Sequence, residues 1–259
     1  MDRFKITNEL SATYGILTDE DTERMRKLST SLLSDPICNV SAAEAKSFLL
    51  EADDVDDESW QGRFSWAWSG RADGTNKLFQ LTMERLENRK LQEALGVGAG
   101  FNHQLFWMFT HAWLLHKRMI VFDDRAQEED YFNALFRVVD NWLIVKEIPR
   151  HRLSVEMQNA QRHALGFCVS LDVAIERPDI LGGRILEALY NTFHEGQVPR
   201  DDPQLVLLTK YVIRQAAFAL VIPRPNFLQG KFIWADLPLP QRFAQPKKNA
   251  FKQQKLFKH

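Results

Sequence analysis

The chain has 259 residues, of which 45% are hydrophobic and 26% are charged, and its formal net charge is -1. This composition can bury a sizeable core and excludes an intrinsically disordered protein. The two cysteines, Cys38 and Cys168, lie far apart and outside any Cys-x-x-Cys pattern. They indicate neither a disulfide framework nor a cysteine zinc site, and they fit a reducing compartment.

The first 50 residues are expected to hold two short helices. One begins after Thr18, which has the side chain of an N-cap residue. The other begins at Ser41, and the sequence from Ser41 to Glu44 has the pattern of a capping box, in which Ser and Glu side chains satisfy backbone donors. A longer helix is expected over residues 76–95, ended by Gly96.

The middle of the chain carries three apolar stripes at helical spacing, which predict three helices. The first helix is expected over residues 104–122, the second ends before Pro149, and the third covers residues 153–171. The stripes consist of Leu105, Met108, Ala112, Leu115 and Met119; of Phe132, Leu135, Val139, Trp142 and Leu143; and of Leu153, Met157, Ala160, Ala164, Cys168 and Leu171.

The last third of the chain predicts one more helix and an extended segment. Asp202 followed by Pro203 is a strong start signal, and the helix is expected to run through Leu220 and to end before Pro223. Only residues 230–237, GKFIWADL, have a strand-like pattern. We therefore expect an all-α domain with short N-terminal helices and an extended C-terminal arm.

Neither a conventional leader nor a membrane span is expected. The opening MDRFKITNEL lacks the apolar run of a signal peptide, and it contains Asp2 and Glu9, which a transit peptide would avoid. The longest apolar stretches are interrupted by Arg, Lys or Asp within about a dozen residues, short of the roughly 20 that a transmembrane helix needs.

Charge is distributed unevenly. Residues 51–58 hold six acids in eight positions, whereas after Asp236 there are six bases and no acid. We interpret these runs as a solvated loop and a solvated tail, and the alternative is a tail that binds RNA, anionic lipid or an acidic protein face. The tail residues that would make such contacts are Lys247, Lys248, Phe251, Lys252, Lys255, Phe257 and Lys258.

Catalytic and cofactor motifs are not found. Residues 96–100, GVGAG, follow a helical pattern instead of a strand, which favours a helix connector over a phosphate-binding loop. The seven histidines form no His-Glu-x-x-His pattern, no Glu stands three residues before any of them, and no Gly-x-Ser-x-Gly motif occurs. We therefore expect a protein that is not an enzyme and that binds no metal or nucleotide cofactor.

Two segments combine aromatic and polar residues. In residues 60–68, WQGRFSWAW, the spacing suits either a helix or a strand, and core burial or a protein interface is the expected role of the rings. In residues 109–119, FTHAWLLHKRM, helical spacing places His111 at the border of the apolar face. We interpret His111 as a boundary histidine that is hydrogen-bonded to a neighbouring helix, with a partner contact as the alternative.

The segments FWMFTHAWLLHKRM, LEALYNTFHEGQVPRDDPQLVLLTKYVIRQAAFAL and GKFIWADLP resemble the ubiquinol-cytochrome c chaperone family. The resemblance covers about residues 101–237 and depends on the order and spacing of helix-face patterns. The matching residues are His111, Trp113, Arg118 and Met119 in the first segment, Leu205, Leu207, Tyr211 and Val212 in the second, where Gln215 lies one place from the family's Gln, and Gly230 and Trp234 in the third. It divides the chain into an N-terminal helical extension (residues 1–95), the chaperone-like domain (101–237) and a basic tail (238–259).

The resemblance implies a helical, non-enzymatic assembly factor on the matrix side of the mitochondrial inner membrane, peripheral to the bilayer. Its implied partners are newly made cytochrome b or protein subunits of a mitochondrial complex, with mitoribosomal RNA or anionic lipid as further partners of the tail. His111, Trp113 and Arg118 then become candidate partner-binding residues. The alternative is a permanent accessory subunit of a respiratory complex, ATP synthase or mitoribosome, because a shared fold alone does not decide function.

Overall fold

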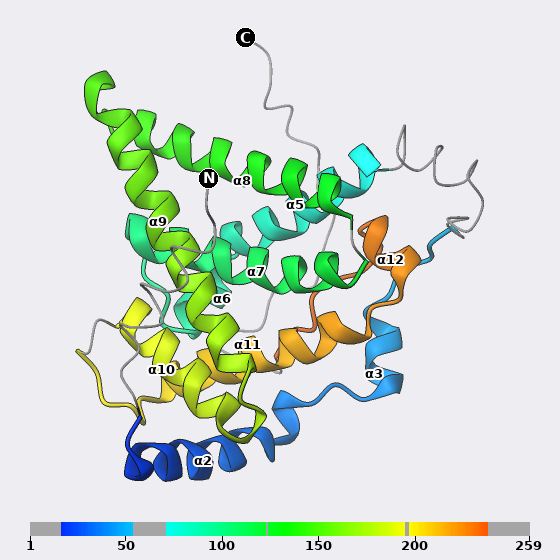
Figure 1. Cartoon of the computed structure of the whole chain (residues 1–259). Coiled ribbons are helices and arrows are strands. Elements are labelled where there is room, and N and C mark those ends of the chain that lie inside the picture. The colour runs from blue at the N-terminus through cyan, green and yellow to red at the C-terminus, as the bar shows by residue number, and fades with distance from the viewer. Residues whose placement is uncertain (1–16, 54–70, 123, 195–196, 238–259) are drawn as a thin grey trace.

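The computed structural model describes residues 17–53, 71–122, 124–194 and 197–237 (Figure 1). The α-helices in this part of the chain are α2 (Asp19–Leu33), α3 (Ala42–Ser47), α5 (Arg71–Glu87), α6 (Arg89–Ala94), α7 (Phe101–Phe122), α8 (Arg125–Val145), α9 (Arg150–Ile175), α10 (Leu181–Phe193), α11 (Pro203–Val221) and α12 (Arg224–Leu228). Two short 3-10 helices, η1 (Pro36–Cys38) and η3 (Pro178–Ile180), accompany them. The predicted all-α fold class is confirmed.

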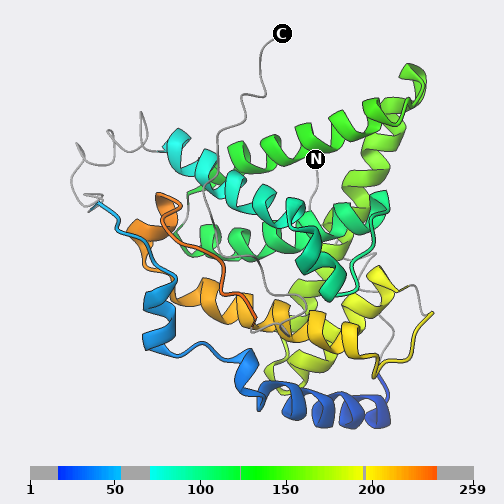
Figure 2. The same cartoon turned by 180° about the vertical axis from the view of Figure 1, so that it is seen from behind.

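Helix α7 is the central helix of the fold. It packs against α5, α8, α9, α10 and α11, and Figures 1 and 2 show α8 and α5 on one side of it and α11 on the other. Twelve of its 22 residues are buried, and they are spread around the helix instead of along one stripe. A helix with apolar side chains all round is expected to lie inside a protein, and α7 does.

The helix starts that depend on local chemistry lie where the sequence predicts them. The Thr18 hydroxyl accepts a hydrogen bond from the Asp21 N–H at 3.1 Å, and the Ser41 hydroxyl accepts one from the Glu44 N–H at 3.2 Å. Only this half of the capping box is formed, because the Glu44 carboxylate pairs with Arg214 of α11 instead. Asp202 caps α11 as predicted, and Gly96, with a φ of 72°, follows the end of α6.

The single helix predicted over residues 76–95 is wrong in two respects. It begins earlier, at Arg71, and it is broken into α5 and α6 at Asn88. The Asn88 carboxamide accepts a hydrogen bond from the Leu91 N–H at 3.1 Å, so Asn88 acts as the N-cap of a new helix. An asparagine inside a periodic pattern thus marks a helix boundary.

Helix α10 was not among the predicted elements. Its first turn contains Gly182 and Gly183, which lower helix propensity and hide the pattern. The structure gives the reason for them: a Cβ on Gly183 would lie 2.8 Å from the Met25 carbonyl oxygen of α2. The glycines therefore allow α2 to approach α10 closely, and the Gly183 N–H donates to the Ser29 hydroxyl at 2.8 Å.

The strand-like segment 230–237 forms an extended arm without a regular strand. Its pairing within the described residues is one antiparallel bridge between Leu49 and Phe232. Gly230 has a φ of 61°, and a Cβ at this position would lie 2.4 Å from the Cβ of Lys77. A glycine is required at Gly230 both for the left-handed backbone and for the close approach to α5.

The hydrophobic core extends across the predicted boundary between the N-terminal extension and the chaperone-like domain. Leu32 of α2 and Leu78 of α5 belong to the same buried cluster as Leu105 of α7 and Leu208 of α11. Residues before position 95 therefore contribute to the core of the domain that the family resemblance covers.

Helix α11 is the one described helix that is long and apolar enough to cross a membrane, judged by length and composition alone, and 56% of the relevant window is buried in the fold. It carries Lys210 and Arg214, which pair with Asp35 and Glu44. This burial and these ion pairs are typical of a core helix. The absence of a transmembrane helix stays a prediction.

Candidate partner-binding site around helix α7

His111 lies at the centre of the core, so the prediction that it borders the apolar face is wrong. Its ring is fully buried because α11 and the C-terminal arm cover this side of α7. The predicted hydrogen bond to a neighbouring helix is present: Nε2 lies 2.8 Å from the Tyr211 hydroxyl of α11. Nδ1 lies 2.9 Å from the Trp107 carbonyl oxygen, which can only accept. Nδ1 therefore donates, and neutral Nε2 accepts from Tyr211.

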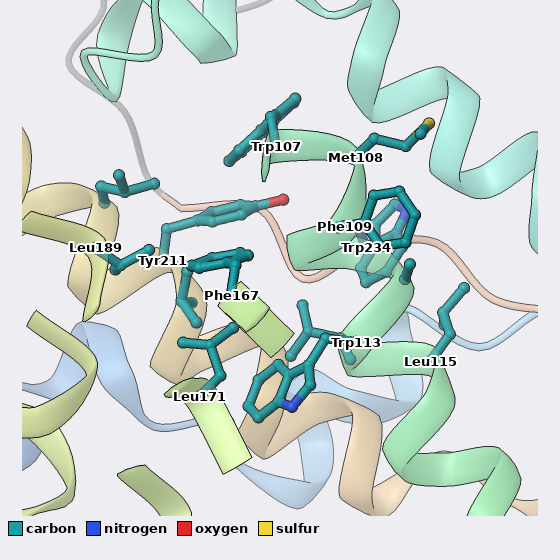
Figure 3. Packing of buried hydrophobic residues seen from close by; sticks show 14 of the residues in the cluster. Trp107, Met108, Phe109, Trp113, Leu115, Phe167, Leu171, Leu189, Tyr211 and Trp234 are labelled. Carbon is teal, nitrogen blue, oxygen red and sulfur yellow. The ribbon is translucent and has the colours of Figure 1, made fainter. Parts of the chain in front are cut away.

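Aromatic rings surround His111. The ring centroids of Trp107 and Trp234 lie 4.4 Å and 4.9 Å from that of His111, both in edge-to-face geometry. Tyr211 reaches toward Trp107 from α11, with ring centroids 5.4 Å apart (Figure 3). Three of the residues that carry the family resemblance, His111, Tyr211 and Trp234, thus meet in one buried cluster although they are distant in sequence. Their role in this fold is internal packing.

Burial of His111 makes the stability of the protein depend on pH. It lowers the His111 pKa to about 3, mainly through loss of solvation, whereas the unfolded chain has the ordinary value near 6.5. Because the unfolded state binds the proton more readily, His111 favours unfolding progressively as the pH falls from about 6.5 toward 3, and this contribution is absent above 6.5.

We therefore expect His111→Gln to lose less unfolding free energy than the wild type between about pH 7 and about pH 5, since glutamine does not titrate. Urea denaturation at both pH values measures the difference. Replacement of the exposed His151 by Gln is the control. An equal loss in His111→Gln and in the wild type would contradict the prediction.

Trp113 also lies inside the protein. Its indole N–H donates to the Asp172 carboxylate of α9 at 2.6 Å, and the same carboxylate pairs with Lys117 at 2.5 Å. The side chain reaches from α7 toward α9 (Figure 3). Trp113 and His111 both have internal partners in this fold, so a contact of either residue with another protein stays a prediction.

Arg118 is the one of the three candidate residues on α7 that is partly exposed. Its guanidinium donates to the Ile222 carbonyl oxygen at the end of α11 and lies 4.5 Å from the centroid of the Phe122 ring. Burial lowers the Arg118 pKa from its ordinary value. Arg118 therefore joins the ends of α7 and α11 while part of its surface stays accessible to a partner.

The C-terminal arm is fixed by α11. The Arg214 guanidinium donates to the carbonyl oxygens of Ala235, Ile37 and Asn39 at 3.0, 3.1 and 2.8 Å, and it pairs with Glu44. One buried cation thus joins α11, η1, α3 and the arm.

The next residue of α11 and two residues of the arm complete this attachment. The Gln215 amide donates to the Ala235 carbonyl at 2.8 Å and accepts from the Ala235 N–H at 3.1 Å. The Trp234 indole N–H donates to the Leu81 carbonyl at 3.0 Å, and Asp236 pairs with Arg85 of α5. The arm is therefore part of the core structure up to the residue at which the basic tail begins.

The tail candidates Lys247, Lys248, Phe251, Lys252, Lys255, Phe257 and Lys258 lie outside the described residues, as do the aromatic segment 60–68 and most of the acidic run 51–58. Their predicted partner contacts stay predictions.

Groups of three or more His, Cys, Asp or Glu side chains that could hold a metal ion do not occur in residues 17–53, 71–122, 124–194 and 197–237. Burial raises the pKa of the Cys38 thiol to about 11, and it also raises that of Cys168, so both thiols stay protonated at neutral pH. The connector 96–100 joins α6 to α7, as predicted, and the Gly98 N–H donates to His103.

The family model described as ubiquinol-cytochrome C chaperone matches residues 93–234, which is more than half of the chain. The chain belongs to the ubiquinol-cytochrome C chaperone family. The match begins in α6 and ends at Trp234 in the arm, so it contains the His111 cluster and the helices around it. Membership in this family indicates a chaperone-like role. Comparisons with curated proteins and with solved structures gave no match.

Sequence reasoning missed two buried cations that join separate parts of the chain. Arg85 of α5 pairs with Asp236 of the arm, and Arg214 of α11 pairs with Glu44 of α3. A buried cation needs acceptors, but the sequence located α5 and α11 by their helix boundaries and not by their charged residues. What the sequence could not supply was the identity of those acceptors, which include the backbone carbonyls of Ile37, Asn39 and Ala235.

Proposed function

We propose that this protein is a non-enzymatic chaperone that holds newly made cytochrome b during the assembly of respiratory complex III, on the matrix side of the mitochondrial inner membrane. The observation that carries the proposal is the family match over residues 93–234. The helical fold supports it, since the matched helices contribute most of the buried core and leave apolar side chains exposed on outer helix faces and ends.

Exposed aliphatic side chains provide a surface for such a client. The junction of α8 and α9 projects from the body in Figures 1 and 2. At this junction Val145 is 81% exposed, and Ile144 and Val155 are also exposed. Apolar side chains on a projecting turn can contact an apolar polypeptide segment before it enters the membrane.

Affinity purification in mild detergent, followed by mass spectrometry, tests the proposal. We expect sub-stoichiometric recovery of newly made cytochrome b or of mitochondrial ribosomes that translate it. Recovery of a stable stoichiometric complex would contradict the chaperone role and favour a permanent accessory subunit of a respiratory complex, ATP synthase or mitoribosome.

The projecting junction can be tested separately. Val145→Asp is expected to lower the recovery of newly made cytochrome b several-fold without changing the thermal midpoint, because the side chain is 81% exposed. Val145→Thr, which keeps the shape of the side chain, is the matched control. Unchanged recovery in a combined Ile144→Asp and Val145→Asp variant would exclude this surface.

The basic tail is proposed to strengthen association with the assembly through charge pairing and its Phe side chains. Deletion of residues 242–259 is expected to leave the helical body folded, because the arm that precedes the tail is held by Arg214 and Gln215. Sedimentation from mitochondrial lysate at low and at moderate salt compares the two forms. If truncation reduces co-sedimentation with the assembly and nuclease treatment does not change this result, a protein or lipid partner is favoured over mitoribosomal RNA. Equal sedimentation at both salt concentrations would show a merely solvated tail.

A further inference from the structure

A cavity of about 310 Å³ lies between α2, α9 and α10. These three helices meet at the lower edge of the molecule in Figures 1 and 2, and α2 packs closely on α10 because of Gly182 and Gly183. The volume is at the lower end of the range for small-molecule sites in proteins, which is about 300–1,000 Å³. The cavity thus has room for a ligand of a few carbon atoms.

The charged residues at this cavity leave one cation without a partner. Arg24 pairs with Asp21 at 3.0 Å, and Glu187 pairs with Arg200 through two hydrogen bonds of 2.7 and 2.9 Å. Arg184 lines the same cavity, and among the described residues it has no ion pair and no hydrogen bond. Its Nε is shielded from solvent and has no acceptor.

The rest of the lining is mixed, with the polar residues Ser170 and Asn191 and several apolar side chains. Met25 of α2, Val173 of α9 and Ala188 of α10 line the cavity together with Arg184. A guanidinium binds a carboxylate through two parallel hydrogen bonds, and the two Nη groups of Arg184, unlike Nε, are not among the shielded atoms. The cavity therefore combines one cation that has no ion pair with a described residue and apolar side chains that a short hydrocarbon chain can contact.

We propose that this cavity binds a single carboxylate that carries a short apolar chain, and that Arg184 binds the carboxylate. A second negative charge on the ligand is disfavoured, because the Asp21 and Glu187 carboxylates line the same cavity. Two sources offer this chemistry: a small aliphatic acid, and the free C-terminal carboxylate of a polypeptide that ends in aliphatic residues.

The test is a titration of the full-length protein, labelled at Met, Val and Ala methyl groups, with hexanoate and with its neutral analogue hexanamide. We expect hexanoate to shift the methyl signals of Met25, Val173 and Ala188, and to bind at least tenfold more tightly than hexanamide. Acetyl-Leu-Leu with a free carboxylate and the same peptide with a terminal amide form the second arm. Tighter binding of hexanoate identifies a small acid as the ligand class, and tighter binding of the free peptide identifies a chain terminus.

Variants at two arginines assign the binding group. Arg184→Gln is expected to weaken binding of the preferred acid at least tenfold, whereas Arg184→Lys, which keeps the charge without the planar fork, weakens it less. Arg137→Gln, on the exposed face of α8 away from the cavity, makes the same charge change and is expected to have no effect. The proposal is overturned if no acid binds, if hexanamide binds as tightly as hexanoate, or if Arg184→Gln binds the acid as the wild type does while it remains folded by circular dichroism.

Discussion

Replacement of Arg214 by Met is expected to lower the free energy of unfolding by roughly 3 kcal/mol. The Arg214 side chain is 4% exposed, and it supplies hydrogen bonds to three backbone carbonyls as well as the ion pair with Glu44. Methionine fits the space of the side chain but donates nothing, so the partly buried carbonyls of Ile37 and Asn39 lose this donor, while Ala235 keeps only its bond from Gln215. Breaking a buried ion pair usually costs about 3 to 5 kcal/mol. The expected loss of unfolding free energy lies at the lower end of this range because Glu44 is 39% exposed and water can solvate its carboxylate in the variant.

Urea denaturation measures this effect, and Arg118→Met is the matched control. Arg118 has one hydrogen bond to a carbonyl, at Ile222, and is only partly buried, so its loss is expected to cost about 1 kcal/mol. The Arg214 variant should also be cleaved more readily by proteases in the arm and in the segment around η1, because Arg214 holds both. A denaturation midpoint equal to that of the wild type would show that the network is not stabilising.

The parts of the fold that could be predicted are those that depend on local chemistry. The caps at Thr18, Ser41 and Asp202 act over a few residues, so the sequence alone locates them. The apolar periodicity that locates α7, α8 and α9 is also local. Most ends of these three helices lie within a few residues of the predicted positions.

The missed helix α10 and the wrong position of His111 both result from contacts in the tertiary structure. Gly182 and Gly183 are unfavourable in an isolated helix, and only the approach of α2 explains their position in α10. His111 was assigned to a border because helical spacing places it between the apolar face and a polar stripe. The structure places His111 next to Tyr211, which lies 100 residues later in the sequence, and no local pattern indicates that these two polar groups form a hydrogen bond inside the core.

The buried cluster around His111 lies within the range that the family model matches. His111, Tyr211 and Trp234 were recognised in the sequence as separate segments of a resemblance, and the structure shows that they contact one another. These three residues of the resemblance therefore hold α7, α11 and the C-terminal arm of this chain together. The residues that contact a client are expected elsewhere, on exposed surfaces such as the junction of α8 and α9, where the sequence has no comparable signature.

Replacement of Trp113 by Ala is expected to cost about 3 to 5 kcal/mol of unfolding free energy, a large share of the roughly 5 to 15 kcal/mol that stabilises a typical domain. The ring is 2% exposed, and its N–H donates to Asp172. The alanine variant leaves a cavity between α7 and α9, so the amount of folded protein should fall before any specific contact changes.

Thermal and urea unfolding of Trp113→Ala, with Trp113→Phe as the control, measure this cost. Phenylalanine keeps a six-membered ring in the site and removes the rest of the indole, including the N–H that donates to Asp172, while Lys117 remains paired with that carboxylate. The control should therefore lose clearly less stability than the alanine variant. If both variants unfold at the wild-type midpoint, the Trp113 ring does not stabilise the core, and its place in the family pattern reflects a contact with a partner instead.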